Sequence, residues 1–288
     1  MVELLVAMTL LSLIVFVLMA VFSSTQRAFR ASVTQTDILE GGRAAMELMV
    51  TDLRGATPSD GYLNSAVNFF ATNNDYVYKK YQPLIQPLPA SNASRTNLLQ
   101  YFFVLGRVNT TWTGTGYIVD TTSANPLYPL YRFYAVTNIA NSPATLYLNF
   151  LNAVNGAQWT NMSHVMDGVV HLVVRAYDAK GYWMTNGYGN EQQANLPPNT
   201  WFSAPYPPSS TVPPAGEVAF YFYSNCVPAS VELQLGVLED RTLKRAASLA
   251  GSASAQLSYL QNQAGHVQLF RQRVTIPNVD PSAYPAYP

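Results

Sequence analysis

The chain has 288 residues, of which 16 are basic and 16 acidic, so it carries no net charge at neutral pH. This balance gives no bulk field that would attract nucleic acid, and the single cysteine, Cys226, excludes an internal disulfide. Only 11% of the residues are charged, as expected of an exported, loop-rich β protein. Cys226 lies in an apolar run and is expected to be a small core residue.

The first predicted element is an apolar run over residues 4–22 that contains no charged side chain. At about 1.5 Å per residue, a helix of this length nearly crosses the ~30 Å hydrocarbon core of a membrane. Thr9 and Ser12 interrupt the run, and their hydroxyls are expected to bond to helix carbonyls. A cleaved secretory signal is the rival interpretation, but no Lys or Arg precedes the run. The run therefore predicts one membrane helix.

Helical sequence continues from Ser23 to about Arg54. Gly41 and Gly42 interrupt this segment and could allow a bend, and the run from Gly55 to Pro58 ends it. Residues 1–55 are therefore predicted to form one rod, with one half in lipid and the other against a head. The apolar stripe of the second half comprises Phe22, Ala28 or Phe29, Val33, Ile38 or Leu39, Ala45, Leu48, Met49 and Leu53.

Residues 56–288 are predicted to form a β-rich head outside the cytoplasm. Residues 98–108 are apolar on both faces, as in a central strand. Residues 169–178 and 229–237 alternate, and His171 and Arg175 fall on the polar face of the first, where a solvated histidine is expected. Weaker strand candidates are residues 116–120, 130–137, 145–151, 217–224 and 267–276.

Three segments rich in Pro, Asn and Ser are predicted to be loops, namely residues 82–94, 187–214 and 278–288, the last a loose tail. Residues 240–265 predict a helical insertion, with Asp240 and Ser252 as N-caps and Gly265 as a stop. The fold class expected is α+β, a long N-terminal helix packed on an antiparallel β-rich head with this insertion.

Glu3 is the only charged residue before Arg27. A carboxylate at the edge of a bilayer is costly unless water hydrates it or a cation pairs with it. The string from Val2 to Leu13, VELLVAMTLLSL, resembles the prepilin-type N-terminal methylation motif of type IV pilins and type II secretion pseudopilins. In that family the glutamate pairs with the terminal amine of a neighbouring subunit in the filament. The resemblance implies this assembly role for Glu3.

The same resemblance implies that the apolar residues after Glu3 form the core of a helix bundle in a filament. These residues are Leu4, Leu5, Leu10, Leu11, Leu13, Ile14, Phe16, Leu18 and Phe22. Met1 stands where the family has Leu, and the family's leader and Phe-Thr pair are absent, so the natural start is expected upstream. A prepilin peptidase would then be a further partner.

Parts of the head resemble the minor pseudopilin J of type II secretion systems. Residues 166–183 are similar to a strand followed by an Asp-x-x-Gly-x-Trp turn, and residues 227–235 to a Leu-Pro-x-x-Val strand with Val227 in place of Leu. Residues 130–134, LYRFY, echo a Leu-x-Arg-Tyr strand. The loop at 184–216 and the insertion at 240–265 have no counterpart in that pattern.

No motif in the head predicts an enzyme. His164, His171 and His266 lack Cys or Asp at ligand spacing, and neither a Gly-x-Ser-x-Gly elbow nor a phosphate-binding loop occurs. No catalytic residue, metal or cofactor is therefore predicted. Paired carboxylates for glycoside hydrolysis stay open, because their pairing is spatial.

Aromatic residues gather around the Gly- and Pro-rich loop, and Tyr182, Trp183, Trp201 and Phe202 form a candidate contact surface for carbohydrate or protein. The alternative is that these rings, with Tyr188 and Tyr206, only pack the loop onto the sheet.

The resemblance implies a non-enzymatic minor pseudopilin, anchored by one helix in the bacterial inner membrane, with its head in the periplasm. Its expected partners are other pilin-like subunits at the tip of a hetero-oligomeric filament, and not nucleic acid. Two alternatives remain, a minor pilin of a type IV pilus or DNA-uptake fibre, and a signal-anchored periplasmic enzyme or binding module.

Overall fold

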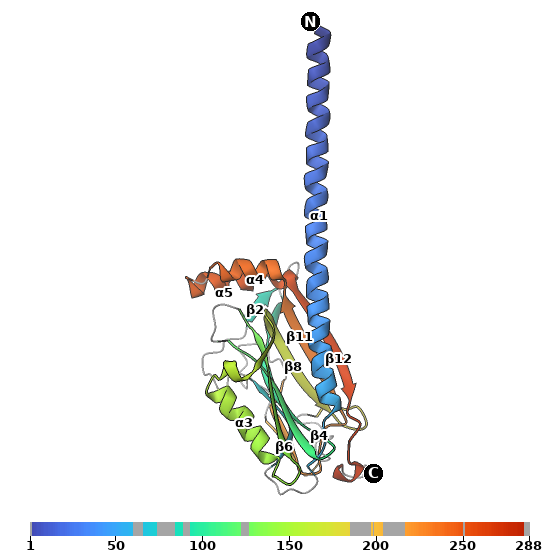
Figure 1. Cartoon of the computed structure of the whole chain (residues 1–288), viewed down its shortest axis with the longest axis vertical. Coiled ribbons are helices and arrows are strands. Elements are labelled where there is room, and N and C mark those ends of the chain that lie inside the picture. Colours follow the sequence, from blue (N-terminus) through green and yellow to red (C-terminus); the bar gives the residue numbers. More distant parts are fainter. Residues whose placement is uncertain are drawn as a thin grey trace.

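The computed structural model describes residues 2–59, 66–73, 84–88, 93–121, 127–184, 197, 199–203, 217–249 and 251–284. Its dominant element is α1, a single helix of 53 residues over Val2–Arg54. The N-terminal half of α1 projects from a head whose described residues form two main antiparallel sheets and three short helices (Figure 1). This arrangement confirms an N-terminal apolar helix on an α+β, mostly antiparallel domain.

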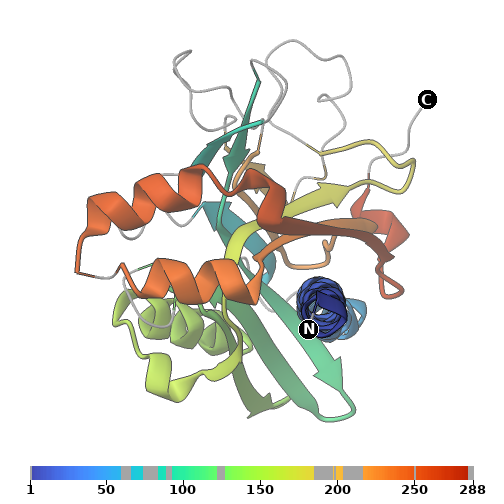
Figure 2. The same cartoon turned by 90° about the horizontal axis from the view of Figure 1, so that it is seen from above.

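The C-terminal half of α1 packs into the head through one face. Its buried side chains are Ile38, Ala45, Met46, Met49, Val50 and Leu53, which recur at helical spacing. Seen along its axis, α1 lies between β12 and the strands β4 and β5 (Figure 2). Gly41 and Gly42, which could have allowed a bend, lie within α1, and the helix runs straight through them (Figure 1). Instead, a Cβ on Gly42 would lie 2.3 Å from the Phe270 ring, so this glycine permits close packing.

The larger sheet has seven strands in the order β7-β6-β5-β4-β1-β10-β9. Its strands are β1 (Val67–Asn73), β4 (Gln100–Val108), β5 (Thr111–Val119), β6 (Leu130–Asn138), β7 (Ser163–Met166), β9 (Thr200–Phe202) and β10 (Phe220–Tyr223). One face meets α1 and the smaller sheet in the main core. The other face is covered by helix α3 (Ala144–Asn155), and the 3-10 turn η1 (Trp159–Asn161) follows it.

Helix α3 corrects the prediction of a strand over residues 145–151. Its buried side chains, Leu146, Tyr147, Phe150, Ala153 and Val154, have the spacing of one helical face. The sheet makes room for that face with glycine, because a Cβ on Gly116 would lie 2.4 Å from the Phe150 ring. The short apolar run was compatible with either element, and packing against the sheet decides for the helix.

The smaller sheet has the order β12-β11-β8, with β8 over Val169–Tyr177, β11 over Ser230–Leu238 and β12 over Val267–Thr275. The predicted turn after β8 is confirmed. The Asp178 Oδ1 accepts hydrogen bonds from the backbone N–H groups of Lys180 and Tyr182, at 3.0 and 2.7 Å. Gly181 has φ +88°, a conformation that glycine adopts without strain.

The helical insertion is confirmed as two helices, α4 (Asp240–Ala247) and α5 (Ala253–Gln261), followed by the turn η3 (Ala264–His266). Ser252 caps α5 as expected, because its side chain accepts a hydrogen bond from Ala255 N, whereas Glu239 takes the N-cap position of α4. Both helices lie across the end of the head from which α1 emerges (Figures 1 and 2).

All three predicted loops contain regular structure. Strand β2 (Leu84–Pro87) lies within residues 82–94 and pairs with β3 (Ser94–Asn97), which begins at the end of that segment, and β9 lies within residues 187–214. The tail is packed as far as Tyr284, through the turn η4 (Pro281–Ala283) and a 2.6 Å hydrogen bond from the Tyr284 hydroxyl to Val227 O. The prediction of a loose tail is therefore wrong for residues 278–284, and residues 285–288 lie outside the described residues.

Candidate functional site

The N-terminal half of α1 is an apolar rod that the head leaves uncovered. Residues Val2–Gln26 are long and apolar enough to span a membrane, and no part of their most apolar stretch is buried. The hydroxyls of Thr9 and Ser12 donate to the carbonyls of Val6 and Met8, both at 2.8 Å, as expected. These bonds satisfy the polar groups of the run within the helix, which suits an apolar environment.

Apolar side chains are exposed all around this rod. Leu4, Leu10, Leu11, Leu13, Ile14, Phe16, Leu18 and Phe22 are each more than half exposed, and the side chain of Leu5 lies outside the described residues. Glu3 is exposed in the first turn, and among the described residues it forms no ion pair. A rod that is apolar on every side needs lipid or other helices around it.

Asp52 fastens the base of α1 to the larger sheet. Arg132 on β6 donates to both carboxylate oxygens, from Nε at 2.8 Å and from Nη2 at 2.9 Å. The hydroxyl of Tyr117 on β5, which is fully buried, also donates to Asp52. A bidentate pair of this kind fixes orientation as well as contributing energy. It therefore holds the rod at one angle to the head.

We expect Asp52→Asn to lower the free energy of unfolding by about 2 kcal/mol, because Arg132 loses its anion in a partly buried place. Chemical denaturation of the full chain in detergent micelles measures this loss. Asp167→Asn is the matched control, since Asp167 pairs with His164 at an exposed site. Equal effects of the two substitutions would contradict a fastening role for Asp52.

The outer face of the smaller sheet carries a buried network of charges. Arg175 on β8 donates from Nε to Glu217 Oε1 at 2.9 Å and from Nη1 to Glu232 Oε1 at 3.4 Å. Arg271 on β12 donates to Glu232 Oε2 at 2.7 Å. Glu217 and Glu232 are only 2% and 4% exposed. Glu217 thus pairs with Arg175 alone among the described residues, whereas Glu232 pairs with both Arg175 and Arg271.

Burial and pairing act on the two carboxyls differently. Burial raises the pKa of Glu217, and the hydrogen bond and charge of Arg175 offset this only in part. Burial also favours the neutral form of Glu232, but hydrogen bonds donated by Arg271 and Gln234 outweigh it, and the pKa is lowered. Arg175 and Arg271 thus act against the cost of burying the two carboxylates, and both arginines come from the chain itself.

His171 is buried, which corrects the expectation of a solvated histidine. It is only 9% exposed, and its Nδ1 accepts a hydrogen bond from Leu98 N at 3.1 Å. Burial, with the charges of Arg95 and Arg175, lowers the pKa of His171 to about 4. The polar face of β8 was identified correctly, but the segment around β3 covers it at this position.

We expect His171 to destabilise the folded chain progressively as the pH falls from about 6.5 to about 4. The unfolded chain takes up the proton at a higher pH than the folded chain does. The free energy of unfolding is therefore lower by about 3 kcal/mol once the pH is below both pKa values. A His171→Gln variant, which keeps an acceptor for Leu98 N, should have a flatter profile of unfolding free energy against pH. An NMR titration giving His171 a pKa above 6 would contradict this.

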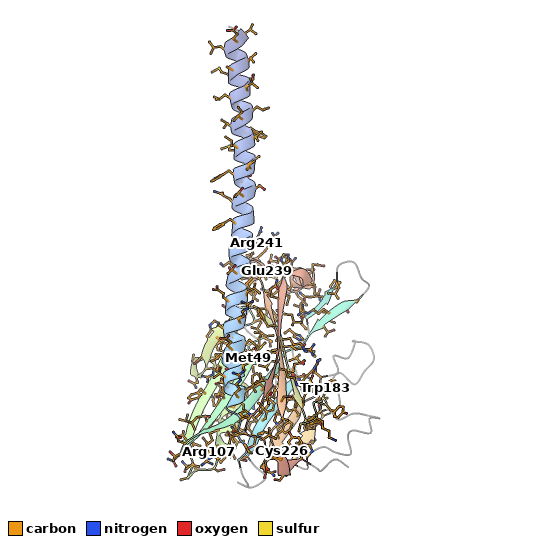
Figure 3. The ribbon with its side chains drawn as sticks, turned by 90° about the vertical axis from the view of Figure 1, so that its right-hand side faces the viewer. Met49, Arg107, Trp183, Cys226, Glu239 and Arg241 are labelled. Atoms are coloured by element: carbon orange, nitrogen blue, oxygen red, sulfur yellow. The ribbon has the colours of Figure 1, made fainter. Side chains whose placement is uncertain are left out.

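The predicted aromatic contact surface is divided by the structure. Phe202 is 5% exposed and belongs to the main core, so its inclusion was wrong. Trp201 is exposed and contacts Tyr221, which packs against the cluster under α3. Tyr182 and Trp183 are exposed elsewhere, and the Trp183 ring lies 5.2 Å from the Arg175 guanidinium (Figure 3). Tyr188 and Tyr206 lie outside the described residues.

Cys226 is fully buried in the main core, as predicted, and burial raises the pKa of its thiol to about 12. Within the described ranges, no three His, Cys, Asp or Glu side chains gather as a metal site would require.

Comparison of the chain with protein-family profiles, with characterised proteins and with solved structures found no match.

Proposed function

We propose that the chain is a non-enzymatic subunit of a pilin-like filament, of the minor pseudopilin type found in type II secretion-like machines. The observation that carries the proposal is α1 itself. Its N-terminal half is exposed and apolar with a carboxylate in its first turn, and its C-terminal half is part of the core of the head. A simple anchor needs neither the carboxylate nor a rigid continuation into the head.

In this proposal, the unassembled subunit is anchored in the inner membrane with its head outside the cytoplasm. Assembly moves the apolar half of α1 from lipid into a bundle of equivalent helices, which exchanges one apolar environment for another. Glu3 sets the register by pairing with the terminal amine of the next subunit, since an unpaired carboxylate in that bundle would be costly. Asp52 and Arg132 keep the head aligned with the moving helix.

Filament fractionation tests this function. The chain is produced together with the pilin-like subunits of its own host, and filaments are sheared from the inner membrane after the outer membrane is opened, and pelleted without detergent. We expect the chain in the filament fraction, in small amounts relative to the main subunit. Retention of the whole population in the membrane, while the companion subunits assemble, would contradict the proposal.

A further inference from the structure

The helical insertion lies at the end of the head that faces the apolar half of α1. Viewed from the N-terminus of α1, α4 and α5 are the nearest parts of the head and lie across it (Figure 2). Arg241 and Glu239 mark this end beside α1, and Arg107 lies at the opposite end (Figure 3). If α1 crosses a membrane, α4 is therefore the part of the head closest to that membrane.

Helix α4 turns its basic face away from the head. Thr242 and Ala246 are buried, and Leu243 and Ala247 pack on the apolar cluster at the end of the smaller sheet. The opposite face carries the exposed cations, which are Arg241, Lys244 and Arg245. Because the buried face rests on the head, these cations lie on the exposed surface of α4, at the end of the head from which the apolar rod emerges (Figures 1 and 2).

Most of this positive charge lacks an anionic partner. Lys244 pairs with Asp240 at 2.6 Å, and Glu239 pairs with His266 at 2.8 Å. Arg241 and Arg245 form no ion pair with any described residue, and Arg245 only lies over the Tyr259 ring at 5.7 Å. Helix α5, which lies beside α4, has no charged residue. From Glu239 to Ala247 three cations thus outnumber two carboxylates by one, and Arg241 and Arg245 are the cations that these carboxylates do not pair with.

The spacing along α1 brings these cations within reach of lipid headgroups. The candidate span ends at Gln26, and Ile38, the first buried side chain among those described in α1, lies about 18 Å further along the helix. The headgroup layer beyond the span is about 6 Å deep, so the head begins about 12 Å from the headgroups. That distance is between one and two Debye lengths of ~8 Å. A helix tilt of ~20° toward α4 would bring α4 closer to the headgroups.

We propose that α4 binds the headgroups of anionic phospholipids in the membrane that α1 crosses, through Arg241 and Arg245. This contact holds the head against the membrane at one rotation about α1. The inference rests on the membrane anchor of the proposed function and is independent of the filament. Each cation near an anionic surface strengthens such a contact about fivefold, so two of them contribute about 25-fold.

Lipid quenching of a probe on α4 tests the proposal with the full chain in vesicles. A fluorophore is attached at Ser248→Cys on the exposed face, and the quencher is a nitroxide on the lipid headgroup. The native Cys226 thiol is fully buried and does not compete for the label. We expect strong quenching in vesicles of phosphatidylcholine with phosphatidylglycerol, and little in phosphatidylcholine alone or in 1 M salt, where the Debye length is ~3 Å.

The double variant Arg241→Gln/Arg245→Gln should reduce quenching to the level of neutral vesicles. Arg107→Gln, which removes a cation from the far end of the head, should leave quenching unchanged (Figure 3). Quenching that ignores lipid charge, or that survives the double variant, would overturn the proposal. So would quenching that depends on the density of protein in the vesicle, which would assign α4 to contacts between copies.

A second probe separates this proposal from the proposed function. A label at Ser12→Cys, in the apolar half of α1, reports insertion through a quencher at the bilayer centre. Insertion without quenching at α4 would overturn the lipid contact alone. Failure of α1 to insert would overturn the anchor, and with it both proposals.

Discussion

Replacing Glu3 with leucine is expected to abolish filament assembly while leaving membrane insertion intact. Leucine makes the first turn of α1 more apolar, so the helix should enter a bilayer at least as well as before. In the proposed bundle, however, the amine of the neighbouring chain would lose its anion. Leaving one partner of a desolvated pair alone costs about 3–5 kcal/mol, which corresponds to a loss of assembly of a hundredfold or more.

The yield of chain in the sheared filament fraction measures this effect, and alkaline extraction of membranes verifies insertion. Glu40→Leu is the matched control, because Glu40 is an exposed carboxylate of the same helix near the head. It should assemble normally. Normal assembly of an inserted Glu3→Leu chain would contradict the role given to Glu3.

The second large effect is expected at Arg175. Arg175→Met keeps most of the volume but leaves Glu217 buried without a cation and Glu232 with Arg271 alone. Breaking a buried pair in this way costs about 3–5 kcal/mol. Thermal and chemical unfolding of the full chain in micelles should show a loss of this size. Arg271→Met should cost clearly less, because Arg271 is mostly exposed and Glu232 retains Arg175.

The loss of stability in Arg175→Met should depend on pH. Without Arg175 the pKa of both carboxyls rises in the folded chain, so their charged forms lower the free energy of unfolding at neutral pH. The deficit relative to the wild type should shrink as the pH falls and the two groups take up protons. Adding Glu217→Gln and Glu232→Gln to Arg175→Met should restore most of the stability at neutral pH. An unchanged deficit in that triple variant would contradict the electrostatic cause.

Sequence reasoning predicted the elements whose signal is local. The length and apolar content of the first run, the alternation in residues 169–178 and 229–237, and the cap at Ser252 each reflect neighbours within a few residues. Helix α3 was mistaken for a strand because residues 145–151 are short and mostly apolar, which suits both elements. The helix is favoured by the glycines of β5, which leave room for its side chains Leu146 and Phe150. These glycines lie about 30 residues before α3 in the chain, so the local sequence does not show them.

The polar networks could not be predicted, because their partners are distant in the chain. Arg175 meets Glu217 across 42 residues, and Arg132 meets Asp52 across 80. His171 was assigned to the correct face of its strand, but whether that face is open depends on what covers it. Phe202 likewise has no local signal that separates it from the exposed Trp201 beside it. Burial of this kind is a property of the tertiary fold.

Cysteine cross-linking measures directly whether α1 packs against the helices of neighbouring subunits. Single cysteines are introduced at successive positions of residues 4–22 in a Cys226→Ala chain, and cross-links to other pilin-like subunits are scored in the filament fraction. We expect cross-links that recur with the helical period of about 3.6 residues and disappear with Glu3→Leu. Assembled filaments without any cross-link through this segment would show that α1 is not an assembly helix.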